Sequence, residues 1–363
     1  MFAKKSVVAG AALLAMAAAA QAEVKIYGYL DAAFGSYENF TKTAGVYDTE
    51  RTTQVSSGNM MTSFIGFAGS EDLGGGLKAE FALESFLATD TGGVLSNMAG
   101  LSNNSGFWGR ASWVGLSGGF GRVILGEYDS AFFTLGYTYN PFGSSMVFSP
   151  TMVSWYGLSG DQLGASLGYD TGWVNSITYE TPNLGGFTAA LQFAPKESSG
   201  ANDGDKNNYA ISGAYNAGPL SVMAVYTNSG DASTNTAYVV RQKNWGLGAS
   251  YDFGVLKLQG QFAQIKSFFD SVTGDEDSKA KFYQLGATVP VTSAGNLLFT
   301  YGQTKYEKAG GDFKLKQFAI GYDHSISKRT GAYAAFTNKK LSGDITINDS
   351  TANVFAVGVR HSF

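Results

Sequence analysis

The chain has 363 residues, and its 25 lysines and arginines against 29 aspartates and glutamates give a net charge of −4. This acidic balance argues against a nucleic-acid partner. The sequence contains no cysteine, which excludes a disulfide framework and thiolate chemistry. Its 48 glycines and 14% aromatic residues, with only six prolines, favour many strands joined by tight turns.

Residues 1–22 have the pattern of a secretory signal peptide. Lys4 and Lys5 form a positive region, residues 7–20 form an apolar run, and an A-x-A cleavage site ends at Ala22. Such a run is about 21 Å long as a helix, too short to span a bilayer. We therefore predict that residues 1–22 are removed and that residues 23–363 form one barrel domain, with 23 basic and 29 acidic residues and a net charge of −6.

The mature chain is a succession of segments in which large apolar residues alternate with small or polar ones. Clear examples are residues 187–193, 220–226, 245–251 and 318–322. A soluble sandwich would expose charged residues on the second face. Here that face carries mostly Gly, Ser, Thr, Ala or Gln, which is typical of a strand between lipid and a water-filled lumen.

The connections between these segments are alternately short and long. Short turns are expected at residues 72–76, 117–121, 183–186, 217–219 and 293–296, and long polar loops at residues 37–59, 88–106, 195–207, 228–243 and 266–279. Such alternation indicates up-and-down strands with one rim on each side of a membrane. We predict an all-β fold, a transmembrane antiparallel up-and-down β-barrel of about 16 strands.

The last eleven residues have the pattern of a final barrel strand. Phe355, Val357, Val359 and Phe363 share one face, while Arg360 lies on the other. A closed barrel in lipid requires an apolar outer face on its last strand. We predict that these four apolar residues form the signal through which barrel-assembly machinery recognises the chain.

Several segments resemble the Gram-negative general porin family. The matching residues are 25–31, 66–81, 109–121, 175–187 and 357–363. The resemblance implies a homotrimeric channel in the bacterial outer membrane that passes small hydrophilic solutes and ions by passive diffusion. It also implies contact with outer-membrane lipid and lipopolysaccharide, and an inward-folded third long loop, here about residues 128–173, that narrows the pore. No cofactor, metal or enzymatic activity is expected.

The sequence departs from the family at three customary basic wall positions, which here hold Phe64, Glu127 and the pair Trp173-Val174. The residues expected at the pore constriction are Arg110, Glu127, Asp129 and Asp161. Further charges expected in the lumen are Lys25, Asp31, Lys78, Glu80, Glu84 and Arg360, whereas Arg122 is expected at the periplasmic rim. The small excess of carboxylates predicts weak cation selectivity.

Other functions are compatible with particular features. The loop is rich in aromatic residues, which either pack it against the inner wall or line the constriction of a substrate-specific channel for sugars or aromatic solutes: Phe132, Phe133, Tyr137, Tyr139, Phe142, Phe148, Trp155 and Tyr156. A barrel serving as an adhesin or anchor is a further alternative. Residues 115–119 match the G-x-S-x-G pattern of hydrolases, but a second strand follows directly, so we interpret them as a turn.

Overall fold

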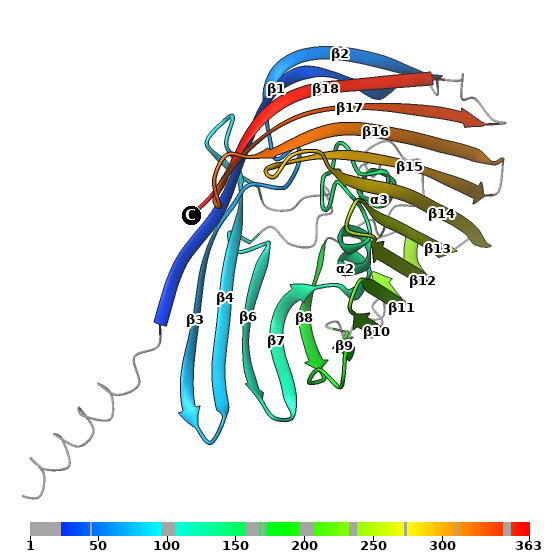
Figure 1. Ribbon diagram of the computed structural model, residues 1–363. Coiled ribbons are helices and arrows are strands. Elements are labelled where there is room, and N and C mark those ends of the chain that lie inside the picture. The colour runs from blue at the N-terminus through cyan, green and yellow to red at the C-terminus, as the bar shows by residue number, and fades with distance from the viewer. Residues whose placement is uncertain are drawn as a thin grey trace, which may run out of the picture.

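The computed structural model describes residues 23–43, 46–95, 106–156, 167, 171–196, 207–231, 238–271, 274–308, 311–343 and 350–363 (Figure 1). Within these residues, eighteen strands form one antiparallel sheet. The strands are β1 (Glu23–Thr43), β2 (Val46–Ser57), β3 (Phe64–Gly74), β4 (Leu77–Ala88), β5 (Gly93–Leu95), β6 (Ala111–Gly118), β7 (Gly121–Asp129), β8 (Gly172–Glu180), β9 (Phe187–Ala194), β10 (Asn208–Ala217), β11 (Leu220–Asp231), β12 (Tyr238–Asp252), β13 (Lys257–Ser271), β14 (Gly274–Pro290), β15 (Gly295–Lys308), β16 (Phe313–Ser325), β17 (Thr330–Gly343) and β18 (Ser350–Ser362).

The sheet closes into a barrel with sixteen positions. β1 pairs with β3 along residues 23–29 and with β2 along residues 32–43, so β2 and β3 together occupy one position. The three-residue β5 is an addition beside the end of β4. Every other strand pairs with the next, and β18 returns to pair with β1. The predicted sixteen-stranded antiparallel barrel is therefore confirmed, and its closure leaves no open edge in the ring.

The two faces of the strands differ as the alternation predicted. In β18, Phe355, Val357 and Val359 are 51%, 43% and 55% exposed, whereas Val354 and Ala356 are buried. Exposed apolar side chains recur along the other strands, including Leu247 and Leu285. An apolar outer face of this kind suits contact with lipid.

Three of the polar stretches expected to be loops are largely strand, which corrects the prediction. Residues 37–59 contain the end of β1 and all of β2, residues 228–243 contain the ends of β11 and β12, and β13 and β14 pair as far as Ser271 and Gly274. The polar side chains of these stretches indicate exposure to water. The backbone N–H and C=O groups of two paired strands can still hydrogen-bond to each other there, so the strands continue. The expected loops at residues 88–106 and 195–207 lie largely outside the described residues.

The segment that follows β7 contains two short helices, α2 (Ala131–Thr138) and α3 (Pro150–Trp155). The side chain of Ser130 caps α2 by accepting a hydrogen bond from the N–H of Phe133 at 3.2 Å, and Ser149 caps α3 in the same way through Met152. Figure 1 shows both helices on the concave side of the sheet. No helix in the described part of the chain is long and apolar enough to cross a membrane.

Most of the aromatic side chains in this segment pack against the barrel wall. All eight that the sequence singled out are buried except Tyr137, which is partly exposed. Glycines on the inner wall allow this close approach: a Cβ on Gly248 would collide with Tyr139, and one on Gly286 would lie 2.5 Å from Pro141. The structure therefore favours the packing alternative over an aromatic-lined constriction.

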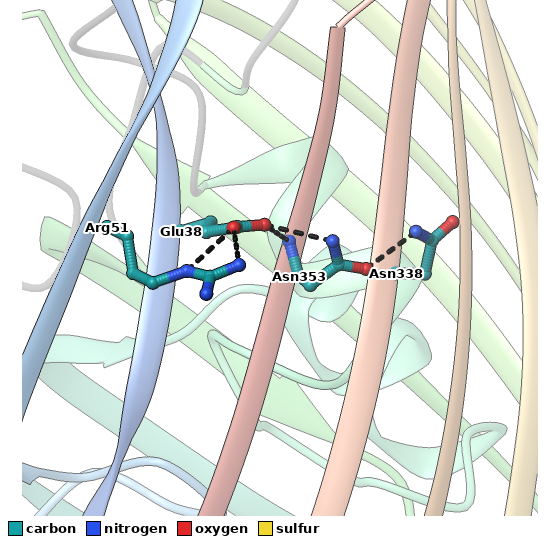
Figure 2. A network of polar contacts seen from close by, with 4 residues as sticks. All are labelled: Glu38, Arg51, Asn338 and Asn353. Carbon is teal, nitrogen blue, oxygen red and sulfur yellow. Dashed lines mark hydrogen bonds and ion pairs between the residues drawn. The ribbon is translucent and has the colours of Figure 1, made fainter.

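The barrel closes at the β1–β18 seam, where a polar network continues the ladder (Figure 2). Backbone pairing ends at Tyr37 and Val354. The next residue of β1, Glu38, then accepts hydrogen bonds from the backbone N–H and the side-chain amide of Asn353, at 2.8 and 2.9 Å. Arg51 of β2 donates to Glu38, and Asn338 of β17 donates to Asn353 at 2.8 Å. Side chains thus join four strand segments across the seam.

Candidate functional site

Arg110 lies at the centre of a polar cluster on the inner wall, directly before β6. Its guanidinium forms an ion pair with Glu84 of β4, which also accepts a hydrogen bond from the hydroxyl of Tyr27 of β1. The same guanidinium stacks over the ring of Phe64, 4.0 Å from its centroid. Phe64 occupies one of the customary basic positions and here supports a cation instead. Carboxylate, phenol and ring together hold Arg110 in one orientation.

Asp129 is the second charged group at this level, at the end of β7 where the chain enters the α2 segment. It interacts electrostatically with Arg110, and both residues line a cavity of about 440 Å³. Tyr137 of α2 lines an adjoining cavity together with Asp129, and burial together with the charge of Asp129 raises the pKa of its phenol. Tyr137 is therefore a neutral hydrogen-bonding group near neutral pH. Arg110, Asp129 and Tyr137 thus lie within electrostatic reach of one another.

A second cluster lies closer to the short turns, around Arg122 of β7. Its guanidinium is 3.4 Å from a carboxylate oxygen of Glu80 and 3.5 Å from one of Glu180. It also stacks on Trp113, 4.6 Å from the ring centroid. The hydroxyl of Tyr128 donates to Glu180 at 2.9 Å. Arg110 and Arg122 are thus each accompanied by two carboxylates, so each cluster carries a net negative charge.

A second cavity, of about 360 Å³, continues the space along α2 and the β8–β11 wall. Tyr128 and Asp129 line both cavities. The two cavities therefore adjoin at this pair of residues. Together the two cavities follow the wall from β1 to β11, beside the packed loop.

The structure brings together two of the four residues predicted at the constriction, Arg110 and Asp129. Glu127 is placed differently: it is opposite Ser112 in the ladder, two residues from the outward-facing pair Val114 and Leu125. It is only 8% exposed and lines neither cavity. It also lies at an irregularity of the β7–β8 pairing between Gly126 and Tyr128, so its place at the constriction stays a prediction. Asp161 lies outside the described residues.

The six further charges expected in the lumen all lie on the inward-facing side of their strands, but their environments differ. Glu80 and Glu84 belong to the two arginine clusters, Lys25 is exposed 3.4 Å from Glu23, and Lys78 is exposed near a short turn. Asp31 is fully buried and accepts hydrogen bonds from the N–H groups of Met60 and Met61 and from Tyr333. Arg360 forms a two-bond ion pair with Asp323 at 2.5 and 2.6 Å. Asp31 and Arg360 therefore support the wall rather than present free charge.

Sequence reasoning missed the cluster formed by Arg122, Glu180, Trp113 and Tyr128. Arg122 does lie near a turn, as expected, but its side chain points inward with Ile124, the buried residue two positions along. The alternation in β7 was the signal that could have placed Arg122 on the inner face, although not its partners.

The described residues contain no group of three acidic or histidine side chains placed to hold a metal. His324 contacts Tyr322 at 3.0 Å and His361 contacts Thr330 at 2.9 Å. Residues 115–119 span the end of β6 and the start of the turn to β7, as interpreted from the sequence.

Comparisons with known proteins agree with this architecture. The family model for Gram-negative porins matches residues 8–344. Outer membrane porin protein 32 of Delftia acidovorans is 35% identical over 99% of this chain and 100% of its own length, and a major outer membrane protein of Neisseria lactamica is 28% identical over the same shares. A solved anion-selective porin from Comamonas acidovorans superposes with a TM-score of 0.75 at 30% identity, covering 94% of this chain and 100% of that one. The chain therefore belongs to the Gram-negative porin family and is an outer-membrane channel for passive diffusion.

Proposed function

We propose that solutes pass the narrowest part of this porin between Arg110 and Asp129, and that the pore weakly prefers cations. The observation that carries the proposal is that two arginines face inward and that each is accompanied by two carboxylates. Arg110 has Glu84 and Asp129 beside it. Arg122 has Glu80 and Glu180 beside it. A lumen with excess carboxylate concentrates cations along the path. The related porin from Comamonas acidovorans is described as anion-selective, so the sign of selectivity is the sharpest question.

The test is the reversal potential of purified protein in a planar bilayer under a salt gradient. A potential of the sign that indicates faster cation passage supports the proposal, and an anion-selective reversal potential would refute it. Arg122→Gln should raise the cation preference, because it leaves Glu80 and Glu180 without their counter-ion. Glu71→Gln, a charge change on the outward parity of β3, is the matched control and should leave the reversal potential unchanged.

A substrate-specific channel remains the second candidate, because the two cavities are lined by Tyr27, Trp113, Tyr128 and Tyr137. Aromatic side chains stack on sugar rings and aromatic solutes. Block of the ion current by one such solute, saturating with concentration, would favour this candidate. Conductance without solute block supports general diffusion, and absence of conductance supports an anchor or adhesin.

The proposal extends to processing and partners. Residues 1–22 are the cleaved signal peptide, and the apolar face of β18 ending at Phe363 is what the barrel-assembly machinery recognises. The mature chain forms a homotrimer, as one structural neighbour, an outer membrane protein of Vibrio cholerae, is described in a trimer form. The outer wall contacts lipid and lipopolysaccharide. The protein transports without catalysis, in keeping with relatives that are porins.

A further inference from the structure

The outward face of β12–β17 carries eight lysines near the rim opposite the C-terminus. We call this set the lysine belt: Lys243, Lys266, Lys279, Lys281, Lys305, Lys314, Lys316 and Lys340. These lysines point to the same face of the strands as exposed apolar residues such as Leu247, Phe262, Leu285 and Ile320. The belt therefore faces away from the lumen and toward the surroundings of the barrel.

The ladder register sets these lysines directly opposite one another. Lys266 is opposite both Lys243 and Lys279, Lys305 is opposite both Lys281 and Lys314, and Lys316 is opposite Lys340. Like charges in directly opposite positions of an antiparallel pair destabilise the sheet. Five such pairs on adjoining strands are therefore a cost that an anionic ligand would remove.

The carboxylates of the protein only partly neutralise the belt. Glu307 lies 3.1 to 3.6 Å from Lys279, Lys281 and Lys305, and Asp312 lies 2.8 Å from Lys305. Among the described residues, Lys266, Lys314 and Lys316 are exposed and form no ion pair. A cavity of about 370 Å³ opens at the rim here, with Lys266, Lys279, Lys308 and Glu307 among its lining residues. The belt thus combines excess positive charge with a hollow.

A row of exposed aromatic side chains adjoins the belt on its membrane side. Trp245, Tyr283 and Phe318 each lie two residues along the strand from a belt lysine and are 38%, 39% and 43% exposed. Such rows mark the level of lipid headgroups. The lysines are therefore at the height of the outermost headgroup charges, on the rim opposite the short turns.

We propose that the lysine belt binds the phosphate groups of the phosphorylated glycolipid in the outer leaflet. This inference rests on the proposed contact with lipopolysaccharide and assigns it a site and a chemistry. Ammonium groups bind phosphate through charge-assisted hydrogen bonds, while the apolar surface beside the belt, including Leu247 and Leu285, receives the acyl chains. A ligand that carries both phosphate and acyl chains fits the two adjoining bands, whereas free phosphate would use only one of them.

The experiment measures binding of purified, detergent-solubilised protein to a bisphosphorylated lipid A and to the same lipid after removal of its phosphates. The belt variant is Lys314→Gln with Lys316→Gln, two residues on the outward face of β16. The control variant is Lys257→Gln with Lys328→Gln, two lysines at the opposite rim. Bilayer conductance of each variant is recorded in parallel, because the pore and the belt are on different faces.

We expect the belt variant to bind bisphosphorylated lipid A about 30-fold more weakly, from roughly fivefold per lysine near an anionic surface, with its conductance unchanged. The control variant should bind as the unaltered protein does. Equal binding by both variants, or equal binding of the dephosphorylated lipid by the unaltered protein, would overturn the proposal. Competition by inorganic phosphate as strong as that by the lipid would reassign the site to free phosphate. A protein that binds lipid but does not conduct would contradict the proposed pore and leave the belt standing.

Discussion

At the scale of single residues, two positions along β7 separate a carboxylate that lines the cavities from one that does not. Glu127 and Asp129 have the same charge and were both predicted at the constriction. Asp129 ends the strand and lines both cavities, whereas Glu127, beside the irregularity between Gly126 and Tyr128, lines neither. A carboxylate about 6 Å from a passing ion, in a water-like dielectric, is worth about 0.7 kcal/mol, roughly a threefold change in ion occupancy.

We therefore expect Asp129→Asn to lower the cation-to-anion permeability ratio about two- to threefold, with salt screening favouring the smaller value. Glu127→Gln should leave the ratio unchanged. Reversal potentials in the same salt gradient give the comparison, and resistance of the barrel to denaturation by detergent at moderate temperature verifies that both variants are folded. A shift in Glu127→Gln equal to that in Asp129→Asn would show that Glu127 acts on the pore as well, contrary to this expectation.

At the scale of elements, the pore geometry depends on how the α2–α3 segment is held against the wall. Inward glutamines hold its backbone: Gln261 donates to the carbonyl of Gly136 at 3.2 Å, and Gln284 accepts from both the N–H and the hydroxyl of Thr151 at 3.2 and 2.5 Å. Tyr306 donates to the carbonyl of Ser154 at 3.1 Å. These contacts fix α2 to β13, and α3 to β14 and β15 at its beginning and its end.

Gln284→Ala should loosen this attachment without unfolding the barrel. The substitution leaves the buried N–H of Thr151 without its partner, a cost of about 1–3 kcal/mol, so we expect noisier open-channel current and closure at lower voltage. Single-channel recordings at increasing voltage measure both effects. Gln303→Ala, which alters a glutamine on the outward parity of β15, is the control and should behave as the unaltered protein. Identical recordings from all three proteins would exclude a role for Gln284 in holding the segment.

The strands show which features of the fold could be predicted from the sequence and which could not. Strand number, barrel closure and the outward face of β18 could be predicted, because period-two alternation is a local signal that residues such as Val357 and Val359 carry themselves. The cluster of Arg122 with Glu80 and Glu180 could not, since it depends on the relative register of three strands. Strand ends above the membrane were also missed, because polarity alone does not distinguish a solvated ladder from a loop.

At the scale of the whole molecule, the two sides of the barrel differ in strand length and in outward charge. β6–β9 are 8 or 9 residues long, about the minimum that spans a bilayer when tilted, whereas β12–β15 have 14 to 17 residues. The described strands β3–β9 have no lysine or arginine on their outward parity, and the lysine belt begins only at β12. A wall whose outward lysines bind phosphorylated lipid and a wall without outward lysine or arginine are suited to different neighbours. We infer that lipid covers the long wall and that the other subunits of the proposed trimer cover the short one.

This inference predicts different lipid access at Val114 of β6 and Leu285 of β14, which are both outward-facing and apolar, 56% and 68% exposed in the single chain. The chain has no cysteine, so a cysteine at either position can be labelled with a nitroxide. In trimers reconstituted into bilayers, dissolved oxygen, which concentrates in the lipid core, should relax the label at 285 more strongly than the label at 114. In folded monomers the two labels should respond equally, because no subunit then covers the short wall. Equal relaxation within the trimer would place the subunit contact elsewhere on the barrel.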